Sequence, residues 1–442
     1  MKARLLPVYF HSGPDADFAK QVNNIVGLLM DVAEILPPLP LGSPIPEHVD
    51  AVVFPQMLGN AYRQVEDIAA LALPKLVITS EFGTMSMWDW EICSYLRDKG
   101  IETIAPYNIT QTQQICRALA VRRELRQVKY MVFQDNPGEG FQASIFKRFY
   151  WWEDECKRKM LDKFGVSIVT KSFRELGAEA KQIPDADAEA VWQTWQSRIP
   201  TANLTARNMY SAIKLYLAVR RELDSDPTIR GVGINCLNES HFSDTTPCLA
   251  WNMLYEERRL IWGCEADTVS ILTKYLLHHS LEVPVMMSNL YPFLMGQAAL
   301  KHERISEFPE VPGNPDNFIL AAHCGYLGVL PQSFSTTWTL KPKVLAIVDE
   351  NSAVIDARLP EGPLTLAKID PGFERLTVIE GELTGYAGYP GSDCLNGAVV
   401  HIPDGHRLMN NLLSHHYIFL TGHQLANIRH VAKVYGLEVD VL

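Results

Sequence analysis

The stretch that decides the fold is LIWGCEADTVSILTKYLLHHSLEVPVMMSN, residues 260–289. It starts with an apolar run suited to a strand, continues with about four turns of helical pattern and ends in a second apolar run. A strand, a returning helix and a second strand form a βαβ unit, which builds a parallel sheet. Glu265 and Asn289 each stand directly after one of the two runs, at the carboxyl ends where function collects in such sheets. We therefore expect both side chains to reach one ligand.

Upstream of this stretch, short β-rich runs alternate with longer helical patterns in two series. Residues 1–125 and 126–288 are therefore predicted to form two open parallel-sheet α/β domains of the Rossmann or flavodoxin type. After about Pro331 the runs become short and alternating, with Gly, Pro and Asp between them at hairpin spacing. Residues 289–442 are predicted to form a C-terminal antiparallel β-barrel-like domain, which ends in a helix over residues 424–435 and the short strand LEVDVL. The expected fold class is α/β, with two such domains followed by the barrel.

The composition excludes several classes of protein. Of the 442 residues, 47% are hydrophobic and 21% are charged, which is typical of a globular chain and not of a disordered one. The formal charge is −11, and no Lys/Arg-rich block with interleaved aromatic residues is present, so we expect no nucleic-acid partner. The chain has no run of 18 consecutive apolar residues, and its start is too weakly apolar for a signal peptide. We expect a cytoplasmic protein without a membrane partner.

The residue types after the two runs point to a metal ion. A carboxylate and an amide oxygen, joined by imidazoles, suit a divalent ion of the Mn²⁺ or Mg²⁺ type. Two histidines in the last third could supply the imidazoles: His323 in ILAAHCGYLG and His416 in SHHYIFLTGH. A purely structural role for these residues also stays open. A histidine in an apolar run is typical of a protein core, and a Glu that begins a helix is favoured by the helix dipole.

A polar loop, CLNESHFSDTTPC, lies at the same expected sheet edge. Glu239, His241 and Asp244 follow the strand that ends at Cys236, and they could line a polar pocket or form a solvated loop. Cys264, next to Glu265, is interpreted as a buried thiol, because the sequence supplies no activating base for a nucleophile.

From that loop to PVMMSNLY, the sequence resembles the fucose isomerase and arabinose isomerase superfamily, and CEAD is the most specific part. The resemblance implies that Glu265 is a metal ligand and a catalytic acid/base, and that Asn289 stands where the family has a second acidic ligand. The tail SHHYIFLTGHQLANIRHVAKVYGLEV is also similar to the family's C-terminal signature, which implies His416 as a ligand and places His423 at the site. The similarity of ILAAHCGYLG implies a further ligand, His323.

This resemblance implies an aldose–ketose isomerase that uses Mn²⁺, or Mg²⁺ or Co²⁺, and passes through an enediol. It further implies a homo-oligomer, a trimer or hexamer, with the active site at a subunit interface. The expected substrate is a deoxy or C6-substituted sugar, either fucose- or arabinose-like or an anionic sugar such as sulfoquinovose. The last option arises because Asn289 removes a negative charge from the site. An amide cannot act as a base, so Glu265 must move the proton alone or with Asp267 or Glu239. We expect Glu239, His241 and His423 to contact the sugar.

Two other functions remain open at this point. The missing carboxylate is compatible with a sugar-binding or regulatory homologue that has lost turnover. A metal-dependent sugar epimerase would need the same enediol and a second acid/base on the opposite face.

Overall fold

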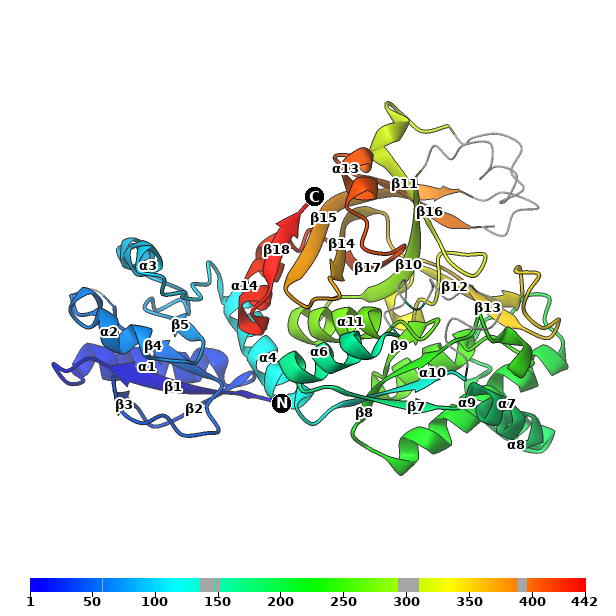
Figure 1. Cartoon of the computed structure of the whole chain (residues 1–442), viewed down its shortest axis with the longest axis horizontal. Coiled ribbons are helices and arrows are strands. Elements are labelled where there is room, and N and C mark those ends of the chain that lie inside the picture. Colours follow the sequence, from blue (N-terminus) through cyan, green and yellow to red (C-terminus); the bar gives the residue numbers. More distant parts are fainter. Residues whose placement is uncertain (58, 136–146, 148–151, 293–309, 388–395) are drawn as a thin grey trace. The chain divides into compact units, whose positions relative to one another are not determined.

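The computed structural model of this chain describes all residues except 58, 136–146, 148–151, 293–309 and 388–395 (Figure 1). The chain divides into two compact units, and each gathers segments that are distant in the sequence. Unit 1 comprises Met1–Arg126, His279–Glu282 and Ala426–Glu438. Unit 2 comprises Gln127–His278, Val283–Leu425 and Val439–Leu442. The boundaries of the three predicted domains at 125 and 288 stay a prediction.

Unit 1 is built on a parallel sheet. Its strands are β1 (Ala3–Tyr9), β2 (Ala33–Ile35), β3 (Leu39–Pro40), β4 (Ala51–Phe54) and β5 (Lys75–Val77), in the order β2-β1-β4-β5 with β3 also paired to β1. Its helices are α1 (Ala16–Leu29), α2 (Val65–Ala69), α3 (Asp89–Asp98), α4 (Ile109–Leu125) and most of α14 (Leu425–Tyr435). Gln111 on α4 donates to Asn427 on α14 over 3.3 Å, so the last helix of the chain packs in the first unit.

Unit 2 contains a second parallel sheet. Its strands, in spatial order, are β7 (Ser167–Lys171), β6 (Lys129–Phe133), β8 (Ile229–Ile234) and β9 (Ile261–Cys264). The helices of this unit are α6 (Asp154–Phe164), α7 (Phe173–Gln182), α8 (Asp185–Trp195), α9 (Ala206–Ser225), α10 (Cys248–Arg258), most of α11 (Thr268–Leu281) and α13 (Gly405–Asn410). Three-residue 3₁₀ turns lie at Ser240–Phe242, Pro315–Asn317 and Gln332–Phe334, and another lies in unit 1 at Ala61–Arg63.

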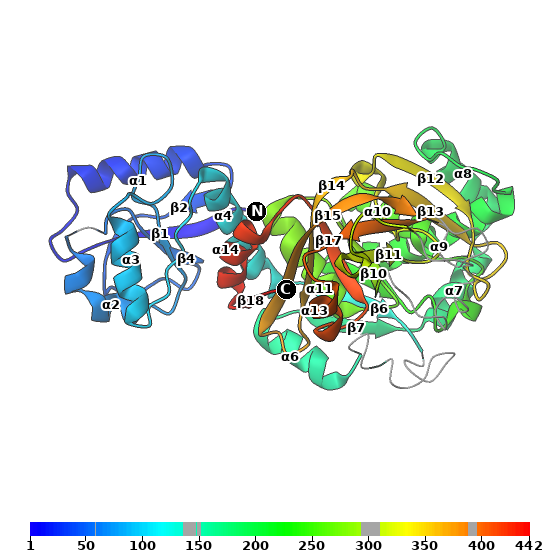
Figure 2. The same cartoon turned by 90° about the horizontal axis from the view of Figure 1, so that it is seen from above.

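The rest of unit 2 is antiparallel. Six strands close into a barrel in the order β14 (Gly362–Ile369), β17 (His416–Thr421), β10 (Val285–Pro292), β11 (Phe318–Ala322), β16 (Gly397–His401) and β15 (Arg375–Ala387), and β15 pairs with β14 to complete the ring (Figures 1 and 2). β18 (Glu438–Val441) adds to β15 outside this ring. A separate hairpin is formed by β12 (Thr337–Pro342) and β13 (Ala353–Arg358).

Helix α11 lies between the parallel sheet and the barrel (Figure 1). On its sheet side, Ile271 packs so closely that a Cβ added to Gly263 would lie 2.6 Å from the Ile271 side chain. On its barrel side, Thr273 Oγ1 accepts a hydrogen bond from the backbone N–H of Ile369 on β14. The helix therefore holds the carboxyl end of β9 against one end of the barrel.

The predicted fold class is confirmed: two parallel α/β sheets are followed by an antiparallel barrel. One expectation about the deciding stretch is wrong, because the strand after α11 does not join the parallel sheet. It becomes β10, which pairs antiparallel with β11 and β17. A short apolar run is equally suited to a buried parallel strand and to a barrel strand, so its pattern cannot choose the partner. No helix among the described residues is both long and apolar enough to cross a membrane.

Candidate metal centre

Glu265 lies in a tight turn that joins β9 to α11. Both Glu265 and Ala266 have a φ of 54°, a left-handed conformation that costs non-glycine residues on the order of 1–3 kcal/mol each. Two hydrogen bonds hold the turn at Ala266: its N–H donates to the carbonyl of Ile234 over 3.0 Å, and its carbonyl accepts from Trp152 Nε1 over 3.2 Å. The surrounding structure therefore fixes the Glu265 carboxylate at the carboxyl end of the parallel sheet.

The register of the barrel brings three further polar residues to one of its ends. Asn289 on β10 lies directly opposite His416 on β17 and opposite Ala322 on β11. Directly opposed residues of antiparallel strands share a face, so the Asn289 and His416 side chains point the same way. His323 follows Ala322 and opens a tight turn in which Cys324 and Gly325 both have positive φ values.

The Glu265 carboxylate faces two imidazoles. Its Oε1 lies 3.8 Å from Nε2 of His416 and 3.9 Å from Nε2 of His323, and all three side chains are at most 4% exposed. These distances exceed a hydrogen bond. Donor atoms that each lie about 2.1 Å from a common ion can be separated by up to about 4.2 Å. The spacing is thus compatible with ligands of one ion.

His415 also belongs to this group, and the sequence interpretation missed it. One ligand atom each from Glu265, His415 and His416 lie within 4.8 Å of one another. The only signal was the adjacent pair of histidines in SHHY, and strand alternation normally sends neighbours to opposite faces. β17 begins at His416, so His415 precedes the strand and is not bound by that alternation.

Several buried polar atoms of the centre have no hydrogen-bond partner among the described residues: Glu265 Oε2, Asn289 Oδ1 and His323 Nε2. Asn289 Nδ2 donates to the Tyr291 hydroxyl over 3.1 Å, which fixes the amide and leaves its oxygen as an unused acceptor. A buried acceptor without a partner costs about 1–3 kcal/mol. Three such atoms, all of types that coordinate divalent ions, fit a bound metal.

Asp267, expected from the sequence to be catalytic, is held by four hydrogen bonds. Its Oδ2 accepts hydrogen bonds from His416 Nδ1 at 2.9 Å, Lys368 Nζ at 2.9 Å and Ser270 Oγ at 2.7 Å. Its Oδ1 accepts from the Ser270 N–H at 2.8 Å. The carboxylate is therefore fully engaged, and it orients His416 so that Nε2 faces Glu265. We describe Asp267 as a positioning residue.

The centre combines a carboxylate with imidazoles whose pKa values shift in different directions. Burial by itself would raise the pKa of Glu265, but the attraction of His416 above all lowers it to about 2. Burial lowers the pKa of His323 to about 4 and that of His415 to about 3. Burial acts the same way on His416, but its hydrogen bond to Asp267 and the charge of Glu265 raise its pKa overall. At neutral pH the centre thus offers a carboxylate and two neutral imidazoles.

The three residues expected to contact the sugar are not brought together. Glu239 is buried, and both of its carboxylate oxygens accept from the backbone N–H of Asp135 at 3.0 Å. His241 is exposed and packs against the Phe242 ring. His423 is exposed beyond the end of β17 opposite to His416, with its Nε2 3.1 Å from the Gly381 carbonyl. The structure does not place His423 or His241 at the candidate centre.

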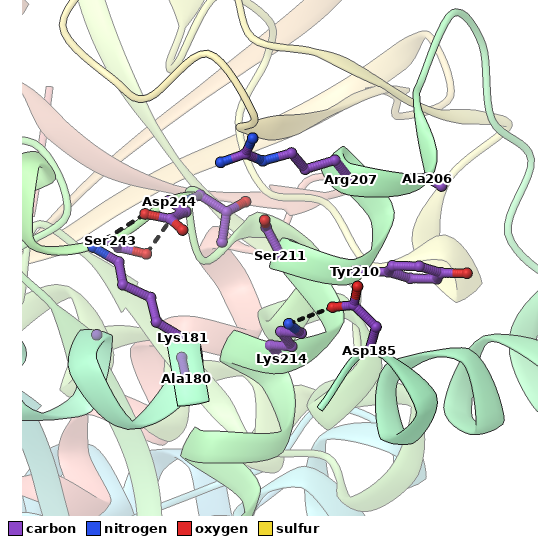
Figure 3. A pocket seen from close by; sticks show the side chains of 12 residues that line it. Ala180, Lys181, Asp185, Ala206, Arg207, Tyr210, Ser211, Lys214, Ser243 and Asp244 are labelled. Carbon is purple, nitrogen blue, oxygen red and sulfur yellow. Dashed lines mark hydrogen bonds and ion pairs between the residues drawn. The ribbon is translucent and has the colours of Figure 1, made fainter. Parts of the chain in front are cut away.

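Asp244, from the same loop as Glu239, does line a pocket, as the sequence suggested (Figure 3). This pocket has a volume of about 460 Å³ and lies among α7, α8, α9 and the loop after Phe242. Its lysines are each paired with an aspartate, Lys181 with Asp244 at 3.0 Å and Lys214 with Asp185 at 2.6 Å. None of the pocket's lining residues belongs to the candidate metal centre.

Comparison with known proteins gives no further assignment. No protein-family model matches this chain, and no curated protein matches it. The candidate centre therefore depends on its own geometry: Glu265, His415 and His416 form a buried group that could hold a metal ion.

Proposed function

We propose that this protein is a metal-dependent aldose–ketose isomerase. The observation that supports it best is the buried Glu265 carboxylate: one of its oxygens has no partner in the described part of the chain, and imidazole nitrogens lie beside it. A purely structural carboxylate at this depth would be expected to have its oxygens hydrogen-bonded, as those of Asp267 are.

The residues that would hold the ion are Glu265 and His416, with Asn289 and either His323 or His415 as further ligands. Their donor set of carboxylate, amide oxygen and imidazole suits Mn²⁺, Mg²⁺ or Co²⁺. When bound, such an ion polarises a sugar carbonyl and acidifies the proton on the neighbouring carbon.

Glu265 is the proposed acid/base. It takes the proton from C2 of the open-chain aldose, which yields the enediol, and returns that proton to C1. The proton of the C2 hydroxyl ends on the C1 oxygen, so the aldose and ketose differ only in the position of hydrogens. Asn289 cannot accept a proton, and the Asp267 carboxylate is engaged by four hydrogen bonds. Glu265 therefore carries the proton transfer alone.

Proton exchange tests this function directly. Metal-stripped protein in D₂O is incubated with and without Mn²⁺, the ion is chelated and removed, and NMR follows a panel of neutral and anionic aldoses. We expect metal-dependent deuterium at C2 and the appearance of ketose. Glu265→Gln should abolish both, because the amide cannot accept the proton, while the matched variant Glu189→Gln, at a half-buried position on α8 outside the candidate centre, should retain them.

Absence of exchange across the panel, with Mn²⁺ shown to be bound, would contradict the isomerase. If Glu265→Gln keeps sugar affinity and the wild type also lacks turnover, the sugar-binding alternative is favoured instead.

A further inference from the structure

Two amide side chains follow β6 and β8, the two strands that precede β9 in the spatial order of the sheet, at the same sheet edge. Gln134 comes directly after β6, and Asn235 comes directly after β8. In the register of the sheet, Phe133 pairs with Ile234, and Ile234 pairs with Cys264, the residue before Glu265. Gln134, Asn235 and Glu265 are thus the first residues after three adjacent strands. Neighbouring strands lie about 4.8 Å apart, so the three backbone positions form a row along the sheet edge.

Both amides lie on the face of the sheet that carries the Glu265 turn. A Cβ added to Gly233 would lie 2.9 Å from the Cα of Ala266, so Gly233 faces this turn, and Asn235, two residues on, shares its face. Val132 packs with Ala266 and Trp152 in one apolar cluster, and Gln134 is two residues on from Val132. Gln134 and Asn235 therefore lie at the same edge and on the same face of the sheet as the turn that carries Glu265.

These amides are buried and have unused hydrogen-bonding atoms. Asn235 is 0% exposed, and neither its Oδ1 nor its Nδ2 has a partner among the described residues. Gln134 is 4% exposed, and its Oε1 has none. Their backbones are satisfied, because the N–H groups donate to the carbonyls of Phe133 and Lys171 in the usual parallel pattern. Within the described part of the chain, only these three side-chain atoms of the two residues lack a partner, which points to a ligand that supplies one.

We propose that Gln134 and Asn235 form a subsite that binds hydroxyl groups of the ligand held at Glu265. An amide offers a donor and an acceptor side by side, and a hydroxyl group offers the same pair, so the two are complementary without any charge. The subsite thus selects a polyhydroxylated chain, such as an open-chain sugar or its sugar alcohol. The inference rests on the proposed function in that both require a sugar at this centre.

The test uses the full-length protein loaded with Mn²⁺ and a panel of alditols: xylitol, arabinitol, ribitol, galactitol and fucitol. Alditols contain the hydroxyl chain but no carbonyl, so they report binding without turnover. We expect at least one of them to bind the wild type in titration calorimetry. Leucine is similar in size to asparagine but apolar. Asn235→Leu should therefore lower the affinity for that alditol at least about tenfold and leave the affinity for Mn²⁺, titrated without alditol, unchanged.

Thermal unfolding supplies a second readout with an expected sign. Because the Asn235 side chain has no partner among the residues that the structure describes, Asn235→Leu should raise Tm by a few degrees while it weakens alditol binding. The matched control is Asn252→Leu. Asn252 is equally buried and its Nδ2 also has no partner among the described residues, but its Oδ1 accepts from the N–H of Gln332 at 2.9 Å, a bond that the substitution would break. This control should lower Tm and leave alditol affinity unchanged.

Three outcomes would overturn the inference: no alditol binds the loaded wild type, Asn235→Leu binds alditols as the wild type does, or Asn235→Leu loses Mn²⁺ instead. The second outcome together with an unchanged or lowered Tm would mean that an internal water satisfies the amide. The proposed isomerase activity can be contradicted independently. If alditol binding depends on Asn235 but no deuterium appears at C2, the subsite is supported and the isomerase activity is not.

Discussion

At the scale of single residues, the candidate centre depends on a second layer of buried charge. His416 contacts Asp267, Asp267 contacts Lys368, and all three side chains are fully buried. Breaking a buried pair by removing one charge is strongly destabilising, because the other charge is left without compensation. The orientation of the metal-facing imidazole and the stability of unit 2 therefore depend on the same carboxylate.

Asp267→Asn tests this coupling. The amide keeps the shape of the side chain but loses the charge that orients His416, so metal affinity should fall about 10- to 100-fold in titrations with Mn²⁺. Asp267→Asn combined with Lys368→Met removes both charges and should recover stability but not metal affinity. The control Asp226→Asn removes a carboxylate bonded to Thr228 and Lys129 and should leave metal affinity unchanged. Wild-type affinity in the double variant would contradict a positioning role for Asp267.

Lys274 on α11 is a second buried charge, and its effect depends on pH. Its Nζ lies 3.7 Å from the centre of the Trp262 ring and has no hydrogen-bond partner among the described residues. Burial is the main cause that lowers the pKa of Lys274 from 10.5 to about 7. The charge of Lys368 lowers this pKa further, whereas Cys264 and Asp267 raise it. Between these pH values the unfolded chain holds a proton that the folded protein does not. The group therefore destabilises the fold progressively as pH falls from 10.5 to 7.

Lys274→Met should consequently raise the free energy of unfolding at pH 7 by on the order of a few kcal/mol. The gain should shrink toward zero at pH 10 and above, which urea unfolding at the two pH values measures. Lys159→Met, at an exposed position on α6, should show no such pH dependence. An equal gain at both pH values would show that titration of Lys274 is not the cause.

At the scale of elements, the site depends on how closely β8 approaches the turn after β9. Gly233→Ala places a methyl carbon 2.9 Å from the Cα of Ala266, so the turn that carries Glu265 must move. We expect a loss of about 1–3 kcal/mol in the free energy of unfolding, together with weaker Mn²⁺ binding. Gly27→Ala, inside α1 with open space around the added carbon, should instead stabilise by about 0.5–1 kcal/mol. Unchanged metal affinity in Gly233→Ala would show that the turn tolerates the shift.

The same elements show what the sequence could and could not predict. The strand, helix and strand over residues 260–289 were predictable because apolar periodicity is a local property. The partner of the last strand was not, since Val285–Pro292 finds its neighbours β11 and β17 more than 25 residues away. Lys368 was missed for a related reason: in LTLAKI it interrupts an apolar alternation on the face of Leu364 and Leu366, and its partners Asp267 and Ser270 lie about 100 residues away in the sequence.

At the scale of the whole molecule, all residues of the candidate centre belong to unit 2. Metal binding should therefore stabilise this unit by mass action, by about 2.7 kcal/mol at an ion concentration 100 times the dissociation constant. Hydrogen exchange with and without Mn²⁺ should show increased protection in β9, β10 and β17 and little change in β1, β4 and β5. Glu265→Gln should lose the effect. Equal protection of both units would contradict a site confined to unit 2.

The return of α14 to unit 1 has a consequence for biosynthesis. Residues 1–126 leave the ribosome first, but the helix that completes their unit lies 300 residues later, at 426–438. At about 5–20 residues per second, that interval lasts roughly 15 to 60 s. The barrel cannot close much earlier than this, because its last strand, β17, ends only at Thr421, and the part of α4 that binds α14 stays uncovered throughout. Unit 1 is thus completed only about 300 residues after its main segment has been made, and until residues 426–438 emerge the nascent chain presents an incomplete surface to chaperones.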